Sequence, residues 1–224
     1  MKILSQRGGA RRRILGVLGI GVLAGGIILT LDLTSESARA DIYSNDCWQY
    51  PSDKMMPCRM DDRNADYCTA VPWPAHIGGR FGEAMSNLDG QTILYDTYAN
   101  PCGSQTDLGG HLSGQTGEVV LPYGTLGKYL CTKLYYGGNS SEWRCDQASI
   151  IFAPYDPAFD KGANGWTDAQ QQTAWRNVLC HEIGHGVGLY HDTGIGGCMD
   201  SVFPVPSTPR YYQPHHVDHI NAAH

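Results

Sequence analysis

The sequence predicts an α+β fold, in which a helix comes first, a group of strands follows it, and a long helix comes after the strands. Apolar residues recur at helical spacing from Ile77 to Leu88, and Asp89-Gly90 is expected to end this first helix. The long helix is expected to begin after Thr167, because Thr167 and Gln170 form a capping-box pattern. Its apolar side should consist of Trp175, Val178, Leu179, Ile183 and Val187.

Strands are expected between these two helices. Segments rich in β-branched, aromatic and other apolar residues predict them, and the last segment is apolar enough for a buried position. A glycine-rich stretch from Cys102 to Gly117 is expected to be a loop. The expected strands are Gln91 to Tyr98, Glu118 to Leu121, Lys128 to Tyr135 and Ala148 to Ala153.

Residues 1–40 have the pattern of a secretory signal peptide. Basic residues come first, an apolar stretch from Ile14 to Leu31 follows, and Ala38-Arg39-Ala40 supplies small residues for cleavage. We therefore expect a secreted mature domain of residues 41–224, in which residues 41–75 form an N-terminal segment tied by disulfides. The alternative is an uncleaved membrane anchor, although the glycines within the apolar stretch weaken it as a spanning helix.

The mature chain is expected to be acidic. Of the sixteen basic and twenty-two acidic residues, residues 1–40 hold six and two, so ten basic and twenty acidic residues remain and the net charge is about −10. Such a charge argues against nucleic acid or an anionic membrane surface as a partner. The length is that of one domain, and we expect a monomer.

All eight cysteines follow the predicted cleavage site, and an even number in an exported chain predicts four disulfides formed in an oxidising compartment. Most pairs cannot be assigned from the sequence. Cys131 and Cys145 are the strongest candidates, because they flank the turn-rich run Gly137–Ser141. Zinc ligation by cysteines is disfavoured, since the chain contains no CxxC pair.

The stretch HEIGHGVGLYH, from His181 to His191, brings several chemically active residues together. In a helix, His181 and His185 lie at i and i+4 on one face, so both imidazoles can reach one Zn2+. Gly188 falls where the helix should end, and a left-handed turn there would bring His191 to the third corner of a tetrahedral site. The fourth corner stays open for water. Glu182 should point toward that water, so we expect it to be a general base and not a ligand.

This HExxHxxGxxH pattern resembles that of the metzincin clan of zinc endopeptidases. Metzincins carry a methionine in a tight turn beneath the zinc, and Met199 follows His191 at a short spacing similar to that of the matrixin branch. Asp192, directly after the third histidine, is instead similar to the residue that the reprolysin branch has at this position. The resemblance implies a twisted mixed β-sheet with an active-site helix, a Met-turn and a C-terminal helix, and it implies that Met199 forms an apolar floor under the zinc.

The same resemblance bears on two cysteines. Cys180 directly precedes His181, and Cys198 directly precedes Met199. If the turn lies beneath the helix, as the resemblance implies, the two sulfurs come within bonding reach. The alternative is that each cysteine pairs elsewhere.

We expect a zinc metalloendopeptidase that hydrolyses internal bonds of a protein or peptide substrate, with His181, His185 and His191 as zinc ligands. Glu182 would take a proton from water and pass it to the leaving amine. Two other functions remain open. One is a zinc-stabilised binding or adhesion module without catalysis, and the other is an exopeptidase or amidase that uses the same zinc chemistry.

Two further segments could hold metal. Asp156–Asp160 and Asn164-Gly165 offer oxygen ligands for Ca2+, although a turn-rich loop explains the same residues. Pro214 should begin a short C-terminal helix in which Val217 and Ile220 pack inward, and His215 and His219 stand at i and i+4 within it. No third ligand lies near them in the sequence, so we interpret them as surface or packing residues, with a second zinc site as the alternative.

Overall fold

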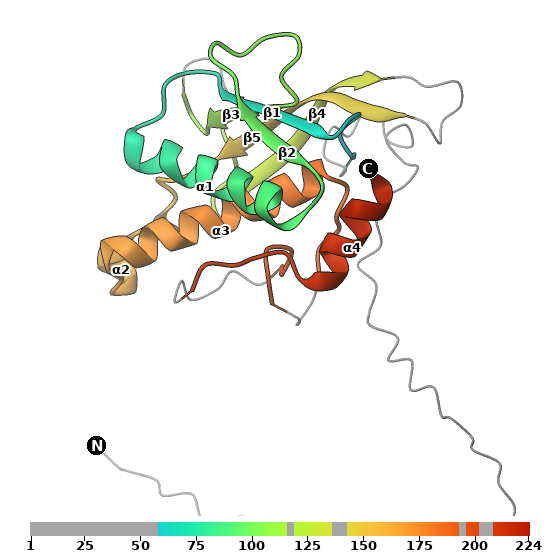
Figure 1. Cartoon of the computed structure of the whole chain (residues 1–224). Coiled ribbons are helices and arrows are strands. Elements are labelled where there is room, and N and C mark those ends of the chain that lie inside the picture. Colours follow the sequence, from blue (N-terminus) through green and yellow to red (C-terminus); the bar gives the residue numbers. More distant parts are fainter. Residues whose placement is uncertain (1–57, 116–118, 136–142, 193–195, 202–207) are drawn as a thin grey trace, which may run out of the picture. The chain divides into compact units, whose positions relative to one another are not determined.

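A five-stranded mixed sheet with helices against it forms the frame of the protein (Figure 1). The computed structural model describes residues 58–115, 119–135, 143–192, 196–201 and 208–224, all within the unit Glu36–His224. The predicted signal peptide and the segment from residue 41 to 57 lie outside the described residues. In the part of the chain that is described, no helix combines the length and apolar character needed to cross a membrane.

The strand order across the sheet is β2-β1-β3-β5-β4. β2, β1, β3 and β5 run parallel to one another, and β4 pairs antiparallel with β5 and forms one edge. The expected α+β class with a mixed sheet is therefore confirmed. The bounds are β1 Asn64–Thr69, β2 Tyr95–Tyr98, β3 Leu108–Leu112, β4 Gly127–Tyr135 and β5 Arg144–Phe152.

Helices α1 (Ala75–Gln91) and α3 (Asp168–Gly186) pack against each other on the same side of the sheet (Figure 1). Two short helical turns, η2 (Pro157–Phe159) and α2 (Lys161–Asn164), precede α3, and α4 (Pro214–Ala223) ends the chain. The predicted apolar side of α3 is buried, as are Ile220 of α4 and Ile77, Phe81 and Leu88 of α1. These contacts form one hydrophobic core between the helices and the sheet.

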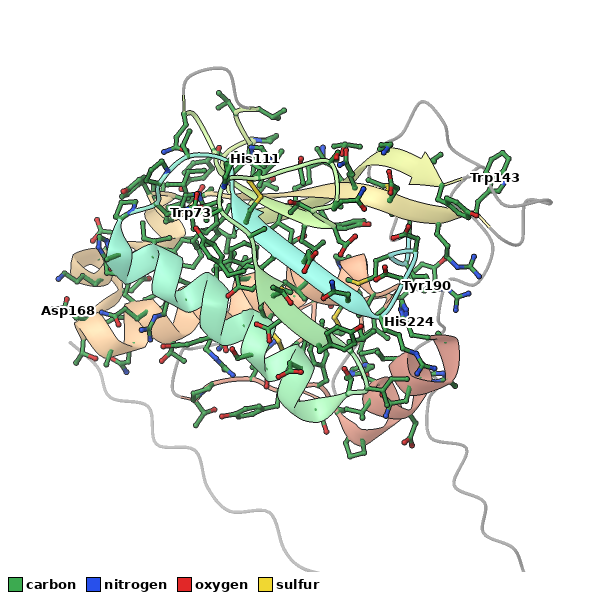
Figure 2. All side chains as sticks on the ribbon, turned by 45° about the horizontal axis from the view of Figure 1, so that its top comes forward. Trp73, His111, Trp143, Asp168, Tyr190 and His224 are labelled. Atoms are coloured by element: carbon green, nitrogen blue, oxygen red, sulfur yellow. A yellow bond between two sulfur atoms is a disulfide. The ribbon has the colours of Figure 1, made fainter. Side chains whose placement is uncertain are left out.

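The glycine-rich stretch expected to be a loop contains β3, so that prediction is wrong. Packing requires the glycine at position 110, because a Cβ there would lie 2.8 Å from the Phe81 ring and 2.9 Å from the Trp73 ring. Trp73 stacks on Phe81 and lies between the start of α1 and the sheet (Figure 2). Two aromatic rings packed onto the strand therefore explain Gly110, which the sequence suggests to be part of a loop.

Three other expectations are corrected. α1 continues through Asp89-Gly90 to Gln91, whose side chain exchanges two hydrogen bonds with the backbone of Tyr212, and β2 therefore begins only at Tyr95. Residues 119–121 form no strand. The N-terminal segment also contributes more than expected, because its residues Asn64–Thr69 are an interior strand of the sheet.

Disulfides join Cys68 to Cys102, Cys131 to Cys145, and Cys180 to Cys198. The pairing of Cys131 with Cys145 and the bridge between Cys180 and Cys198 are thus confirmed. Cys58 is also disulfide-bonded. The predicted turn Gly137–Ser141 lies outside the described residues. These bridges indicate that the protein folds in an oxidising, extracellular environment.

Candidate metal centre

The long helix positions the first two histidines. Thr167 and Gln170 form the predicted capping box, in which the Thr167 hydroxyl accepts from the Gln170 N–H and the Gln170 side chain accepts from the Thr167 N–H. Regular helix then runs to Gly186, so that His181 and His185 are one turn apart on the face toward the cleft.

The end of the helix positions the third histidine. Gly188 has a left-handed backbone with φ of 88°, as expected. Its N–H donates to the carbonyl of His185, and the Leu189 N–H donates to the carbonyl of Gly184. This pair of bonds is a Schellman motif, which reverses the chain at the end of a helix. As a result, His191 returns to the face that His181 and His185 share.

The three imidazoles converge on one point. One ring nitrogen from each of His181, His185 and His191 lies within 4.8 Å of the other two. Nε2 of His185 and Nε2 of His191 are 3.1 Å apart. A tetrahedral zinc site with bonds of about 2.0–2.1 Å has edges of about 3.3–3.4 Å between its ligand atoms. The distance between these two nitrogens is close to that edge, and the three nitrogens together could hold a metal ion.

Hydrogen bonds on the far side of two rings fix which nitrogen faces that point. Nδ1 of His181 donates to the carbonyl oxygen of Cys198 at 2.9 Å, and Nδ1 of His185 donates to that of Leu189 at 2.8 Å. Because Nδ1 carries the proton in both rings, the lone pair of each Nε2 is available to bind a metal ion. Burial lowers the pKa of His181 to about 4 and that of His185 to about 3, and it also lowers the pKa of His191. All three rings are thus neutral near pH 7, the state in which imidazole binds metal.

Glu182 lies beside the histidines and is held by the edge strand. Its side chain is buried, and its carboxylate accepts a hydrogen bond from the backbone N–H of Tyr129 in β4. Burial raises the pKa of Glu182 to about 8, while that hydrogen bond opposes the rise. A divalent cation held by the neighbouring rings would favour the ionised carboxylate. Glu182 is therefore suited to exchange protons near neutral pH.

The histidines and Glu182 line a cleft of ≈ 440 Å³. Its lining includes the start of β4, from Gly127 to Tyr129, and also Cys198, Asp200 and Ser201. Because β4 is an edge strand, it offers backbone groups along the cleft.

Met199 lies beneath the helix and is fully buried. A Cβ on Gly184 would be 2.1 Å from the Met199 sulfur, so the methionine packs directly against the helix backbone between the first two histidines. Gly196 and Gly197 precede it with left-handed backbones, as a tight turn requires. This placement agrees with the expectation of an apolar floor.

Several residues near the site escaped the sequence reasoning. Gly127 and Tyr129 contact Glu182 only because β4 runs past α3, and no local pattern indicates that pairing. Gly184 stands within the motif, and a glycine inside a helix is the one signal that a close contact was required there. Asp192 was singled out only for its resemblance to the reprolysin branch, and its contacts with the C-terminal helix were not foreseen.

The segment considered for Ca2+ uses its carboxylates differently. Asp156 accepts hydrogen bonds from the N–H groups of Gly124 and Ala158, and Asp160 accepts from those of Gly162 and Ala163. These bonds cap the turns η2 and α2. The acidic residues of this loop are thus explained by local structure.

No protein-family model matches the chain, and no curated protein matches its sequence.

Proposed function

We propose that the protein is a secreted zinc-dependent metalloendopeptidase of the metzincin clan, matrixin-like with a reprolysin-like Asp192. One observation carries the proposal, namely three neutral imidazoles that converge beside a buried carboxylate at an open cleft. The signal-peptide pattern of residues 1–40 and the disulfides support secretion.

The set of donors supports zinc as the metal. Three protein ligands with an open fourth position are typical of catalytic zinc sites, whereas structural sites fill all four positions with protein ligands. When bound, zinc acidifies a water molecule and polarises the scissile carbonyl. His181, His185 and His191 would hold the metal through Nε2, and the carbonyls of Cys198 and Leu189 keep two of these rings in the required tautomer.

Glu182 would perform the proton transfers. Glu182 follows His181 in the helix, and it lines the cleft. It is not one of the three residues whose ligand atoms converge. It would accept a proton from the attacking water and return it to the nitrogen of the leaving amine. The Tyr129 N–H holds the carboxylate in place during both steps.

The edge strand supports a polypeptide substrate. A peptide in extended conformation can add to an exposed sheet edge through backbone hydrogen bonds, with little dependence on side chains. β4 offers that edge beside Glu182, so it would align an internal segment of a chain across the site. This arrangement favours an endopeptidase over an exopeptidase or amidase.

A digest of a peptide library, with the products sequenced by mass spectrometry, tests the proposal. Internal cuts that disappear on chelation and return with Zn2+ are expected. Terminal trimming alone would assign an exopeptidase. An absence of cuts by zinc-loaded protein would favour the binding or adhesion module.

A further inference from the structure

A second group of metal-binding side chains lies at the C-terminal helix. Asp192, directly after His191, approaches two consecutive histidines at the start of α4. Its Oδ2 is 3.2 Å from Nε2 of His215 and 3.3 Å from Nε2 of His216. The sequence offered no third ligand for the C-terminal histidines, and the fold supplies one from a segment more than twenty residues earlier.

The three atoms that face one another are buried, and the contacts between them are poorly aligned for hydrogen bonds. Asp192 is 8% exposed and His216 is 0% exposed. Although Oδ2 of Asp192 and the two Nε2 atoms are close together, the directions of the ring nitrogens do not satisfy hydrogen-bond geometry. Buried polar atoms without well-aligned hydrogen bonds are rare in folded proteins, so a group of three that share one space requires an explanation.

The spacing of these atoms is that of metal ligands. The two distances of 3.2 and 3.3 Å agree with the edge of about 3.3–3.4 Å expected between ligand atoms of tetrahedral zinc. They also match the separation of 3.1 Å between Nε2 of His185 and Nε2 of His191 in the first centre. Ring nitrogens that point into the space between the ligands, and not along the line to the oxygen, would give both the short distances and the poor hydrogen bonds.

Charge leads to the same conclusion. Asp192 is buried, and its Oδ2 faces the imidazoles of His215 and His216. A buried carboxylate is stable only when paired with a cation or with several hydrogen bonds. A divalent ion between the carboxylate and the two rings would meet that need.

We propose that Asp192, His215 and His216 form a second divalent-metal site, separate from the His181, His185 and His191 centre and suited to Zn2+. Two imidazoles and one carboxylate are a common ligand set for divalent transition metals. The proposal does not depend on peptide hydrolysis. A metal bound here would join α4 to the residue that follows His191.

Metal binding at this second site would change one hydrogen bond. The Gln213 N–H donates to Nδ1 of His216 at 3.2 Å. A neutral histidine that binds metal through Nε2 carries its proton on Nδ1, which can no longer accept. Metal binding must therefore break this long hydrogen bond at the start of α4 and release the Gln213 N–H to another acceptor. Nitrogen NMR of His216 would detect the exchange of the proton between its two ring nitrogens.

Counting zinc by native mass spectrometry on untagged, disulfide-intact protein tests the site. We expect two Zn2+ per chain for the wild type and one for His215→Ala, whose side chain is 18% exposed and tolerates truncation better than His216. The matched control is His219→Ala on the same helix, which should keep two. His185→Ala, which disrupts the first centre, should keep the second ion.

Two results would overturn the proposal. A single Zn2+ in the wild type that is lost in His185→Ala would show that the cluster is a hydrogen-bonded anchor only, while the first centre stands. Two Zn2+ retained in both His215→Ala and Asp192→Asn would place the second ion elsewhere. Unfolding midpoints of each variant, measured without metal, separate loss of a ligand from loss of the fold.

Discussion

Gly127 of β4 lies against Glu182 of α3, so closely that a Cβ on the glycine would be 2.7 Å from Oε1 of the carboxylate. The same Cβ would be 2.9 Å from a methyl group of Val178. The edge strand therefore approaches α3 at a distance that only glycine permits. It is this approach that allows the Tyr129 N–H to reach the Glu182 carboxylate.

Gly127→Ala should reduce hydrolysis without removing zinc. The added methyl must push the Glu182 side chain aside, and a displacement of about 1 Å at a catalytic group can lower the rate about 100-fold. The three atoms nearest to the new methyl belong to Glu182 and Val178 and not to a histidine, so zinc stoichiometry should stay at the wild-type value. Steady-state kinetics and metal analysis measure the two effects. Gly90→Ala in α1, where nothing lies within 4 Å of the new atom, is the control and should keep full activity.

The Cys180–Cys198 bridge should support zinc binding as well as stability. It closes a loop with a sequence separation of 18, for which the chain-entropy estimate is about 3 kcal/mol. It also ties the carbonyl of Cys198, which orients His181, to the residue that precedes His181. Replacing both cysteines with alanine should therefore lower the free energy of unfolding and weaken zinc binding, as measured by competition with a chelator.

The Cys131–Cys145 bridge provides a matched comparison, because it closes a loop with a separation of 14 at the far end of β4 and β5. Its double alanine variant should lose similar stability but keep its zinc affinity. Equal losses of affinity in the two variants would contradict a specific role for Cys198.

Met199→Leu should be tolerated. The side chain is fully buried and packs on Gly184, so its volume matters more than its sulfur. A volume-conserving change in a core usually costs less than about 1.5 kcal/mol, and activity should be largely kept. Urea unfolding and zinc analysis provide the measurements. If this variant failed to bind zinc at all, Met199 would be a ligand and the metzincin proposal would be wrong.

The sequence predicted best what depends on short-range spacing. The capping box at Thr167, the i and i+4 histidines and the left-handed Gly188 are each defined within one or two helical turns, and the structure contains all three local features. The Cys180–Cys198 bridge followed from a resemblance and not from geometry. The backbone positions of the three proposed ligands could thus be predicted from the sequence.

Packing between segments that are distant in the sequence could not be predicted in this way. Gly109-Gly110 suggest a loop, whereas Trp73 and Phe81 pack against Gly110 within a strand. Gln91, at the end of α1, forms two hydrogen bonds with the backbone of Tyr212, which is 121 residues away in the sequence. Asp192 and His216 meet because the chain returns to α3 just before α4 begins. There the Tyr212 hydroxyl donates a hydrogen bond to the carbonyl of Cys180 in α3. Such contacts depend on the complete fold, and no local pattern encodes them.

The central claim is that Glu182 acts with a zinc ion to cut internal peptide bonds. The most direct measurement uses a peptide blocked at both ends, which no exopeptidase can trim, and compares wild type with Glu182→Ala at equal zinc content. We predict internal cleavage by the wild type that stops on chelation, returns with Zn2+, and is about 10²- to 10⁴-fold slower in the variant. Cleavage at an undiminished rate by zinc-loaded Glu182→Ala, or an intact peptide after incubation with the zinc-loaded wild type, would contradict the account.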